Sequence, residues 1–199
     1  MPNLRLPQAY ANAFAAQSVR DALASMGEEA ILLSTYHLFA DLGTQPRCRN
    51  FNSVYEQEDH WNCVRCYGTT FEGGIKNFAR GWAIFTDHPL DEKYTKTGEW
   101  TPDDRSAQLE NEPKLLQHDY IVRVQQWDNT HSPVVWGDRY VIDEVQELTL
   151  RTGNQYGQNH SVDCYGQQAK IHRLPTNHPI FNYNIPLGVP VMRVDSLPR

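Results

Sequence analysis

The chain has 199 residues, enough for one domain with a buried core, and its 18 Lys+Arg against 24 Asp+Glu give a net charge of -6. No window holds the dense basic stripe that gripping nucleic acid requires, and no apolar stretch approaches the roughly 20 residues of a membrane span. The 5 Trp, 10 Tyr and 7 Phe exclude an intrinsically disordered chain. The N-terminal residues lack the pattern of a signal peptide, so we expect synthesis and assembly in the cytoplasm.

The first predicted element is a helix over residues 7–26, with Pro7 in its first turn, an alanine-rich body and Gly27 as the stop signal. Its larger apolar residues spread over a wide arc: Tyr10, Phe14, Val19, Leu23 and Met26. A wide arc is compatible with packing on the same domain and with a contact to a neighbouring subunit.

Short apolar runs with β-branched and aromatic residues then predict strands at 30–38, 81–86, 120–125, 139–151 and 160–174. In the third strand Tyr120, Val122 and Val124 alternate with Arg123 and Gln125, which is the pattern of a half-buried antiparallel sheet. Because no helical pattern separates these strands, we expect a mainly β fold, a small antiparallel β-barrel.

Long segments without a periodic pattern surround this barrel and set the expected organisation. Residues 1–27 form an N-terminal helix or arm and residues 28–174 form the barrel. The barrel carries a cysteine-containing insertion at 43–78 and a long charged loop at 87–117.

The proline-rich residues 175–199 predict an extended C-terminal arm that lies on a neighbouring subunit rather than in the barrel core. Prolines remove the hydrogen-bond donors of a sheet ladder, while the apolar side chains of the segment still need a surface to bury them. The candidate interaction residues are Ile180, Phe181, Tyr183, Ile185, Val189, Val191 and Met192.

The sharpest local feature is the pair Cys63 and Cys66, a Cys-x-x-Cys turn that can present two thiolates to one tetrahedral ion. Cys48 would be a third ligand, but Phe51 stands where the second pair would have its other cysteine. His60 is the nearest candidate for the fourth ligand of a zinc ion. A loop that folds without metal remains an equal alternative.

Without metal, the insertion would be held by packing, and an aromatic cluster is the expected substitute: Phe51, Tyr55, Trp61 and Tyr67. A redox function is disfavoured because a βαβ context is missing, and disulfides are disfavoured in a reducing compartment. The fourth cysteine, Cys164, fits a small buried apolar residue within a strand.

Catalytic signatures are missing from the sequence. It has no Gly-x-Ser-x-Gly elbow, no phosphate-binding glycine loop, and no His-x-x-x-His or His-Glu-x-x-His arrangement among its eight histidines. A hydrolase using Cys66 or a histidine would need a base and an orienting group at a supporting spacing. We therefore expect a protein that is not an enzyme.

Two longer motifs carry a resemblance to a known family. Residues 63–74 read Cys-Val-Arg-Cys-Tyr-Gly-Thr-Thr-Phe-Glu-Gly-Gly, which resembles the Cys-x-x-Cys-Tyr-Gly-Thr-Gly-aromatic-x-Gly-Gly segment of neck proteins of tailed bacteriophages. Residues 137–145, Gly-Asp-Arg-Tyr-Val-Ile-Asp-Glu-Val, resemble the Gly-Asp-Arg-Tyr strand of head-closure (stopper) proteins. Segments 168–174 and 183–186 resemble the strand and exit that close their barrel. The likeness covers residues 28–187 in patches and departs from the family at Phe51 and Thr70.

This resemblance implies a structural virion protein, the head-closure subunit of the head-to-tail connector, assembled in the host cytoplasm. It implies a homo-oligomeric ring between a portal or adaptor ring and tail or tail-terminator proteins, with packaged DNA in the lumen and no membrane partner. The alternatives are another neck protein, an adaptor or tail-completion protein, and a stand-alone zinc-ribbon-like binding module. Adaptors are mostly helical, which the predicted strands disfavour.

Overall fold

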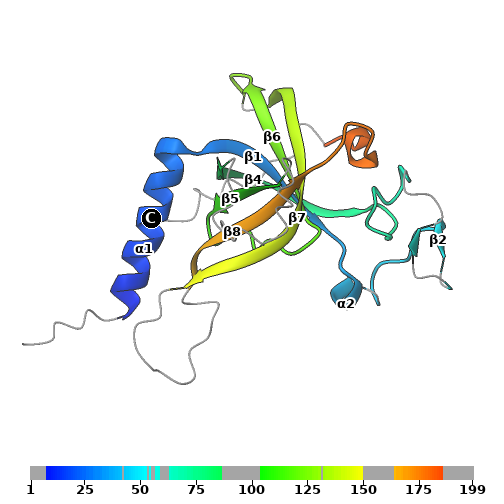
Figure 1. Ribbon diagram of the computed structural model, residues 1–199, viewed down its shortest axis with the longest axis horizontal. Helices are drawn as coiled ribbons and strands as arrows, with labels where there is room; N and C mark the ends of the chain where they lie inside the picture. The colour runs from blue at the N-terminus through cyan, green and yellow to red at the C-terminus, as the bar shows by residue number, and fades with distance from the viewer. Residues whose placement is uncertain are drawn as a thin grey trace, which may run out of the picture.

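The computed structural model describes residues 8–41, 43–52, 54, 57–58, 63–86, 104–130, 132–149 and 164–185. Six antiparallel strands close into a barrel in the order β1-β4-β5-β8-β7-β6, with β6 returning to β1 (Figure 1). The expected mainly β fold, its barrel and its N-terminal helix are confirmed. The barrel strands are β1 (Glu28–Thr35), β4 (Ile75–Thr86), β5 (Asp104–Leu109), β6 (Tyr120–Trp127), β7 (Pro133–Thr149) and β8 (Cys164–Arg173).

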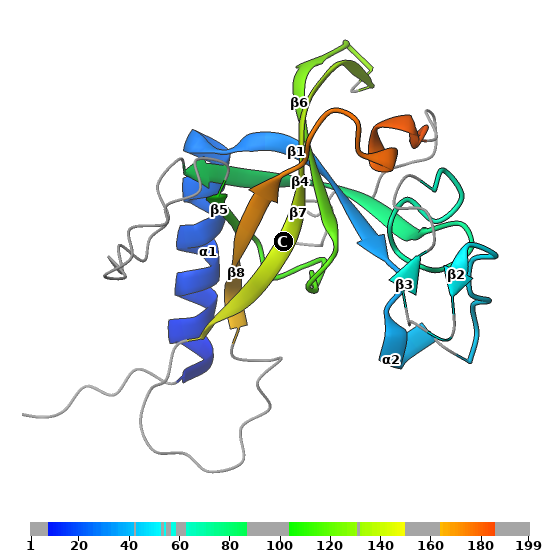
Figure 2. The ribbon, with the colours of Figure 1, turned by 45° about the vertical axis from the view of Figure 1, so that its right-hand side comes forward.

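Helix α1 (Gln8–Met26) packs on the barrel through contacts with β8 and β4, on the side opposite the cysteine insertion (Figures 1 and 2). Val19 and Leu23 are buried there, whereas Phe14 is exposed. The helix ends at Gly27, whose N–H donates to the Leu23 carbonyl at 2.8 Å. A Cβ at Gly27 would lie 2.4 Å from that oxygen, so glycine is required for this stop.

The barrel interior is a narrow apolar core, which we call the inner core. Alanines from four strands line it, together with larger residues such as Ile121, Ile142 and Ile171. Tyr140 fills one end, fully buried, with its ring stacked on Phe85 at a centroid distance of 5.7 Å. Small side chains suit a six-stranded barrel because the facing strands lie close together. The alanines are Ala30, Ala83, Ala107 and Ala169.

A second apolar cluster, the outer core, lies outside the barrel against β1 and β6. Val122 and Leu33 are fully buried in it, beneath a segment that follows β8 and ends in the short helix η1 (Pro179–Asn182). The alternation predicted for β6 is correct, since Tyr120, Val122 and Val124 belong to this cluster. The opposite face of β6 is mixed: Ile121 lines the inner core, Arg123 is partly buried and Gln125 is exposed, so the predicted half-buried alternation holds from Val122 onward.

The segment 87–117, expected to be a charged loop, contains one of the barrel strands. Its residues 104–109 form β5, which pairs with β4 on one side and β8 on the other and so closes the barrel. Gln167 on β8 organises the turn after β5: its Nε2 lies 2.8, 3.0 and 2.9 Å from three main-chain carbonyls, and its Oε1 accepts from the Leu115 N–H at 3.0 Å. The three carbonyls are those of Glu110, Asn111 and Pro113.

The insertion between β1 and β4 contains α2 (Leu38–Asp41), β2 (Phe51–Asn52) and β3 (Gln57–Glu58). We call its described residues in the range 43–74 the cysteine lobe. The predicted insertion ran to residue 78, but its last residues already belong to β4, which begins at Ile75. Within the helices that the structure describes, none has the length and apolar character needed to cross a lipid bilayer.

Candidate metal centre

The cysteine lobe folds around a tight turn at residues 63–66. The Tyr67 N–H donates to the Cys63 carbonyl at 2.9 Å, and the Thr69 N–H donates to the Cys66 carbonyl at 2.9 Å. Gly74 lets the chain pass back over this turn, because a Cβ there would lie 2.5 Å from the Cys66 oxygen and its φ is +67°. The motif's final glycine is thus needed to bring the main chain against the Cys-x-x-Cys turn.

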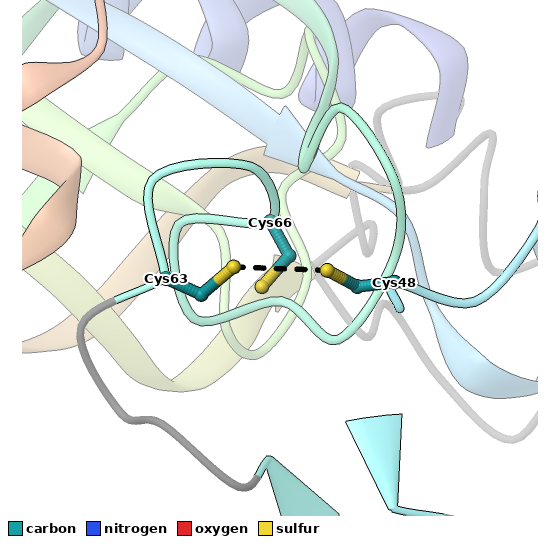
Figure 3. A group of neighbouring side chains, drawn as sticks. All are labelled: Cys48, Cys63 and Cys66. Atoms are coloured by element: carbon teal, nitrogen blue, oxygen red, sulfur yellow. Dashed lines mark hydrogen bonds between the residues drawn. The ribbon is translucent and has the colours of Figure 1, made fainter. Parts of the chain in front are cut away.

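A neighbouring stretch of main chain brings the third cysteine to this turn. The Cys48 N–H donates to the Thr70 carbonyl at 2.9 Å, and an antiparallel bridge joins Arg47 to Phe71. These bonds place the Sγ atoms of Cys48, Cys63 and Cys66 within 4.8 Å of one another (Figure 3). All three side chains are buried, with exposed fractions of 3%, 6% and 0%.

Main-chain N–H groups point at the sulfur atoms of Cys63 and Cys48, with opposite net effects on the two pKa values. Burial raises the pKa of the Cys63 thiol, but the N–H groups of Arg65 and Cys66, together with the Cys66 and Cys48 side chains, outweigh it, so the pKa lies below 9.0. At Cys48 burial dominates over the single N–H of Asn50, and the pKa is raised. The N–H donors within the Cys63 turn therefore favour the thiolate of Cys63, which is the form that binds a metal cation.

The Cys48–Cys63 distance fits an edge of a tetrahedral metal site rather than a disulfide. The Sγ atoms of Cys48 and Cys63 are 3.7 Å apart, and each of the four cysteines is a free thiol. A disulfide needs about 2.05 Å between sulfur atoms. A tetrahedron with metal–sulfur bonds of about 2.3 Å has sulfur–sulfur edges of about 3.8 Å. The three cysteines thus form a group that could hold a metal ion.

Among the described residues the group offers three ligands, all cysteines. His60, the predicted fourth ligand, lies outside the described residues. Phe51, which replaces the expected cysteine, stacks on the Arg47 guanidinium at 4.4 Å, and Phe71 covers that guanidinium at 4.3 Å. Arg47 also donates to the Thr70 hydroxyl. A cation–π sandwich centred on Arg47 therefore stabilises the lobe.

The two described members of the predicted metal-free aromatic cluster, Phe51 and Tyr67, pack in separate places. Tyr55 and Trp61 lie outside the described residues, while Phe51 pairs with Arg47 as above. Tyr67 packs edge-on against Tyr183 at a centroid distance of 5.1 Å, in the outer core. Its carbonyl accepts from the Tyr120 hydroxyl at 3.1 Å, which ties the lobe to the barrel. The described aromatic residues therefore stabilise the lobe through two separate contacts.

A buried carboxylate marks the junction of the lobe with the barrel, and no sequence motif indicated it. Asp119 is 1% exposed and accepts from the Thr35 N–H at 2.7 Å and the Leu116 N–H at 2.8 Å. Its Oδ1 lies 3.3 Å from Nε2 of His37. Burial raises the pKa of Asp119 above the ordinary 3.8, although the two N–H donors act against this change.

Asp41 has the opposite electrostatic character, although it lies near Asp119 through their common partner His37. Its Oδ1 accepts from the Lys76 ammonium at 2.7 Å, and its Oδ2 accepts from the His37 N–H at 2.9 Å. Lys76 and then this N–H lower the pKa of the Asp41 carboxyl. The junction therefore combines one acid held in its ionised form with one that is penalised for ionising.

The described candidate interaction residues of the C-terminal segment pack against the same chain, so residues 175–185 are not the start of an arm lying on a neighbour. Ile180 is 0% and Ile185 is 3% exposed in the outer core, and Phe181 and Tyr183 are partly buried there. The reason is that residues 174–185 cover apolar side chains on β1 and β6 that the barrel leaves outside. The other three candidates, Val189, Val191 and Met192, lie outside the described residues.

Arg139 fastens this segment to the barrel. It is 5% exposed, and its Nη1 donates to the Ile180 carbonyl. Its guanidinium lies 4.9 Å from the Phe181 ring centroid and 5.8 Å from that of Trp136. Burial lowers the pKa of Arg139. This arginine belongs to the Gly-Asp-Arg-Tyr motif, so one residue of that motif holds the C-terminal segment in place.

Cys164 is buried with its Sγ donating to the Gly166 carbonyl at 3.1 Å, and it is not a member of the three-cysteine group. A scan against protein-family models finds no match to this chain, and a search of curated proteins finds none either.

Proposed function

We propose that this chain is a structural subunit of the head-to-tail connector of a tailed bacteriophage, a head-closure protein that forms a ring and retains packaged DNA. The observation that carries the proposal is the position of the two family-like motifs. The Cys-x-x-Cys motif forms the turn of the three-cysteine group, and residues 137–145 run along β7 of a closed antiparallel barrel. The resemblance implied a barrel of this kind.

The shape of the subunit also supports a role in an assembly. A rigid barrel carries α1 on one side, the cysteine lobe on the other, and a long β6–β7 hairpin beyond one end (Figures 1 and 2). Such projections from a packed core offer separate surfaces to neighbouring proteins. The net charge of -6 would disfavour adhesion to DNA passing through the ring.

Zinc is the metal that the cysteine lobe would bind under this proposal, because thiolate-rich tetrahedral sites favour it. Cys48, Cys63 and Cys66 supply three ligands, and His60 is the proposed fourth. A metal held here would join the two main-chain stretches of the lobe, so its binding free energy would add to the stability of the lobe. The proposed role of the ion is structural.

The test uses a phage carrying this gene with an early stop codon and a plasmid that supplies the wild-type chain. Without the protein, we expect heads that package DNA and then lose it, together with unattached tails. Heads that keep their DNA but lack tails would instead indicate a tail-completion protein. Mass spectrometry of complete virions should detect the chain in amounts similar to other neck subunits. Its absence from complete virions refutes the proposal and leaves the zinc-ribbon-like module as the alternative.

A further inference from the structure

The β6–β7 hairpin continues well past the end of the barrel, and we call residues 124–130 and 132–138 the ribbon. The ladder between β1 and β6 ends at the pair Ala30 and Arg123, and the ladder between β7 and β8 ends at Tyr140 and Arg173. Beyond these points β6 and β7 pair only with each other in the described part of the chain. Among the described residues, the ribbon therefore has two outer edges whose main-chain groups lack a ladder partner (Figure 1).

The ribbon has few of the charged residues that usually protect an exposed sheet edge. Besides Asp138, which is ion-paired with Arg173 at 2.8 Å, its only charged side chain is Asp128. Its carboxylate is used inside the turn, where it accepts from the N–H groups of Thr130 at 2.8 Å and Ser132 at 2.7 Å. Lysines are a common protection of free edges, and the ribbon has none. The sequence thus leaves the edges open to another strand.

Exposed apolar side chains lie on both faces of the same ribbon. Val134 is 55% and Val135 is 38% exposed, and consecutive strand residues point to opposite faces. Pro133 and the register shifts at Val124 and Gln126 work against long pairing. An added strand would therefore pair over a short stretch, and a stable assembly would need several such contacts.

From these features we propose that the ribbon is an edge-to-edge contact between copies of this chain, in which the β7 edge of one copy pairs antiparallel with the β6 edge of the next. Because β6 and β7 run in opposite directions, a neighbouring β6 continues the antiparallel sheet. Each copy uses two different edges of one ribbon, which is a head-to-tail contact of the type that closes into rings. The inference names the contact surface of the ring and rests on the proposed function for its biological setting.

The test places a photo-cross-linking amino acid at position 135 of the otherwise wild-type purified chain and identifies the partner residues by mass spectrometry. We expect cross-links to residues 124–127 of a second copy, with a yield that rises with protein concentration. The matched control carries the same probe in place of Val54, an 81% exposed valine in the cysteine lobe, and should give no such product. Equal inter-copy yields from both positions, or no inter-copy product from position 135 up to the solubility limit, overturn the inference.

A second probe-bearing chain keeps the probe at position 135 and carries Val134→Lys, which adds a charged residue at an exposed position of the ribbon edge. We expect the yield of ribbon cross-links to fall about tenfold relative to the probe-bearing chain with Val134, while the thermal unfolding of the monomer stays unchanged. An unchanged yield contradicts the proposed contact. Failure of this inference differs from failure of the proposed function: a chain found in virions without ribbon cross-links refutes only the contact, and a self-associating chain missing from virions refutes only the function.

Discussion

The variant Ile180→Ala tests whether residues 174–185 are part of the folded monomer. Ile180 is fully buried in the outer core, beside Val122 and Leu33. The change removes three carbon atoms, and at about 0.8 kcal/mol for each the lost burial amounts to about 2.4 kcal/mol. The cavity left among rigid strands raises the expected cost to about 3–4 kcal/mol. Domains are typically stable by about 5–15 kcal/mol, so this loss is a large share of the total.

Urea unfolding of the isolated monomer measures this loss. The protein concentration is one at which the probe-bearing chain gives no inter-copy cross-links. The control is Leu116→Ala, which truncates a side chain that is 51% exposed and should change the free energy of unfolding by less than about 0.5 kcal/mol. The slope of free energy against urea should be the same for all three proteins. A cost below about 1 kcal/mol for Ile180→Ala would show that the segment is not packed on its own barrel and would restore the arm prediction.

Three further outcomes are expected. Cys66→Ser should reduce bound zinc in the purified protein from about one ion per chain to near zero by elemental analysis, whereas Cys164→Ser should leave it unchanged. Because the folded pKa of the Asp119 carboxyl lies above 3.8, the folded protein binds the carboxyl proton more tightly than the unfolded chain does. The contribution of Asp119 to the free energy of unfolding therefore falls as the pH rises above about 4. Asp119→Asn should remove this pH-dependent contribution, as measured by urea unfolding at several pH values. Gln167→Leu should destabilise the protein by about 2–4 kcal/mol, because it leaves the main-chain groups of the turn after β5 without their hydrogen-bond partner. Its control, Gln168→Leu on the same strand, should cost less than about 1 kcal/mol.

The strands with strong apolar alternation could be predicted from the sequence. Val122 and Val124 alternate with polar residues, and this pattern correctly identified β6 and one of its faces. Strand β5 could not be recognised in the same way. Its inner-core residues are Ala107 and Leu109, and one small alanine among polar neighbours gives little periodic signal. Its strand character comes from pairing with β4 and β8, which lie far away in the sequence.

The candidate metal site was partly predictable for a different reason. A Cys-x-x-Cys spacing fixes two thiols on one turn, so Cys63 and Cys66 could be assigned without knowledge of the fold. The approach of Cys48 depends on main-chain bonds to Thr70 and on Arg47, whose role between two phenylalanine rings no spacing rule predicts. The burial of Ile180 was missed because a proline-rich segment resembles an arm until the uncovered outer face of the barrel is known.

The outer core joins the first barrel strand to the last described segment of the chain, and this has a consequence during synthesis. Ile31 and Leu33 on β1 emerge from the ribosome early, yet Ile180 and Ile185, which cover them, emerge more than a hundred residues later. A nascent or prematurely ended chain therefore exposes an apolar stripe that chaperones and proteases bind. Translation beyond residue 185 masks the stripe, so the same packing that stabilises the barrel separates finished subunits from incomplete ones before any assembly begins.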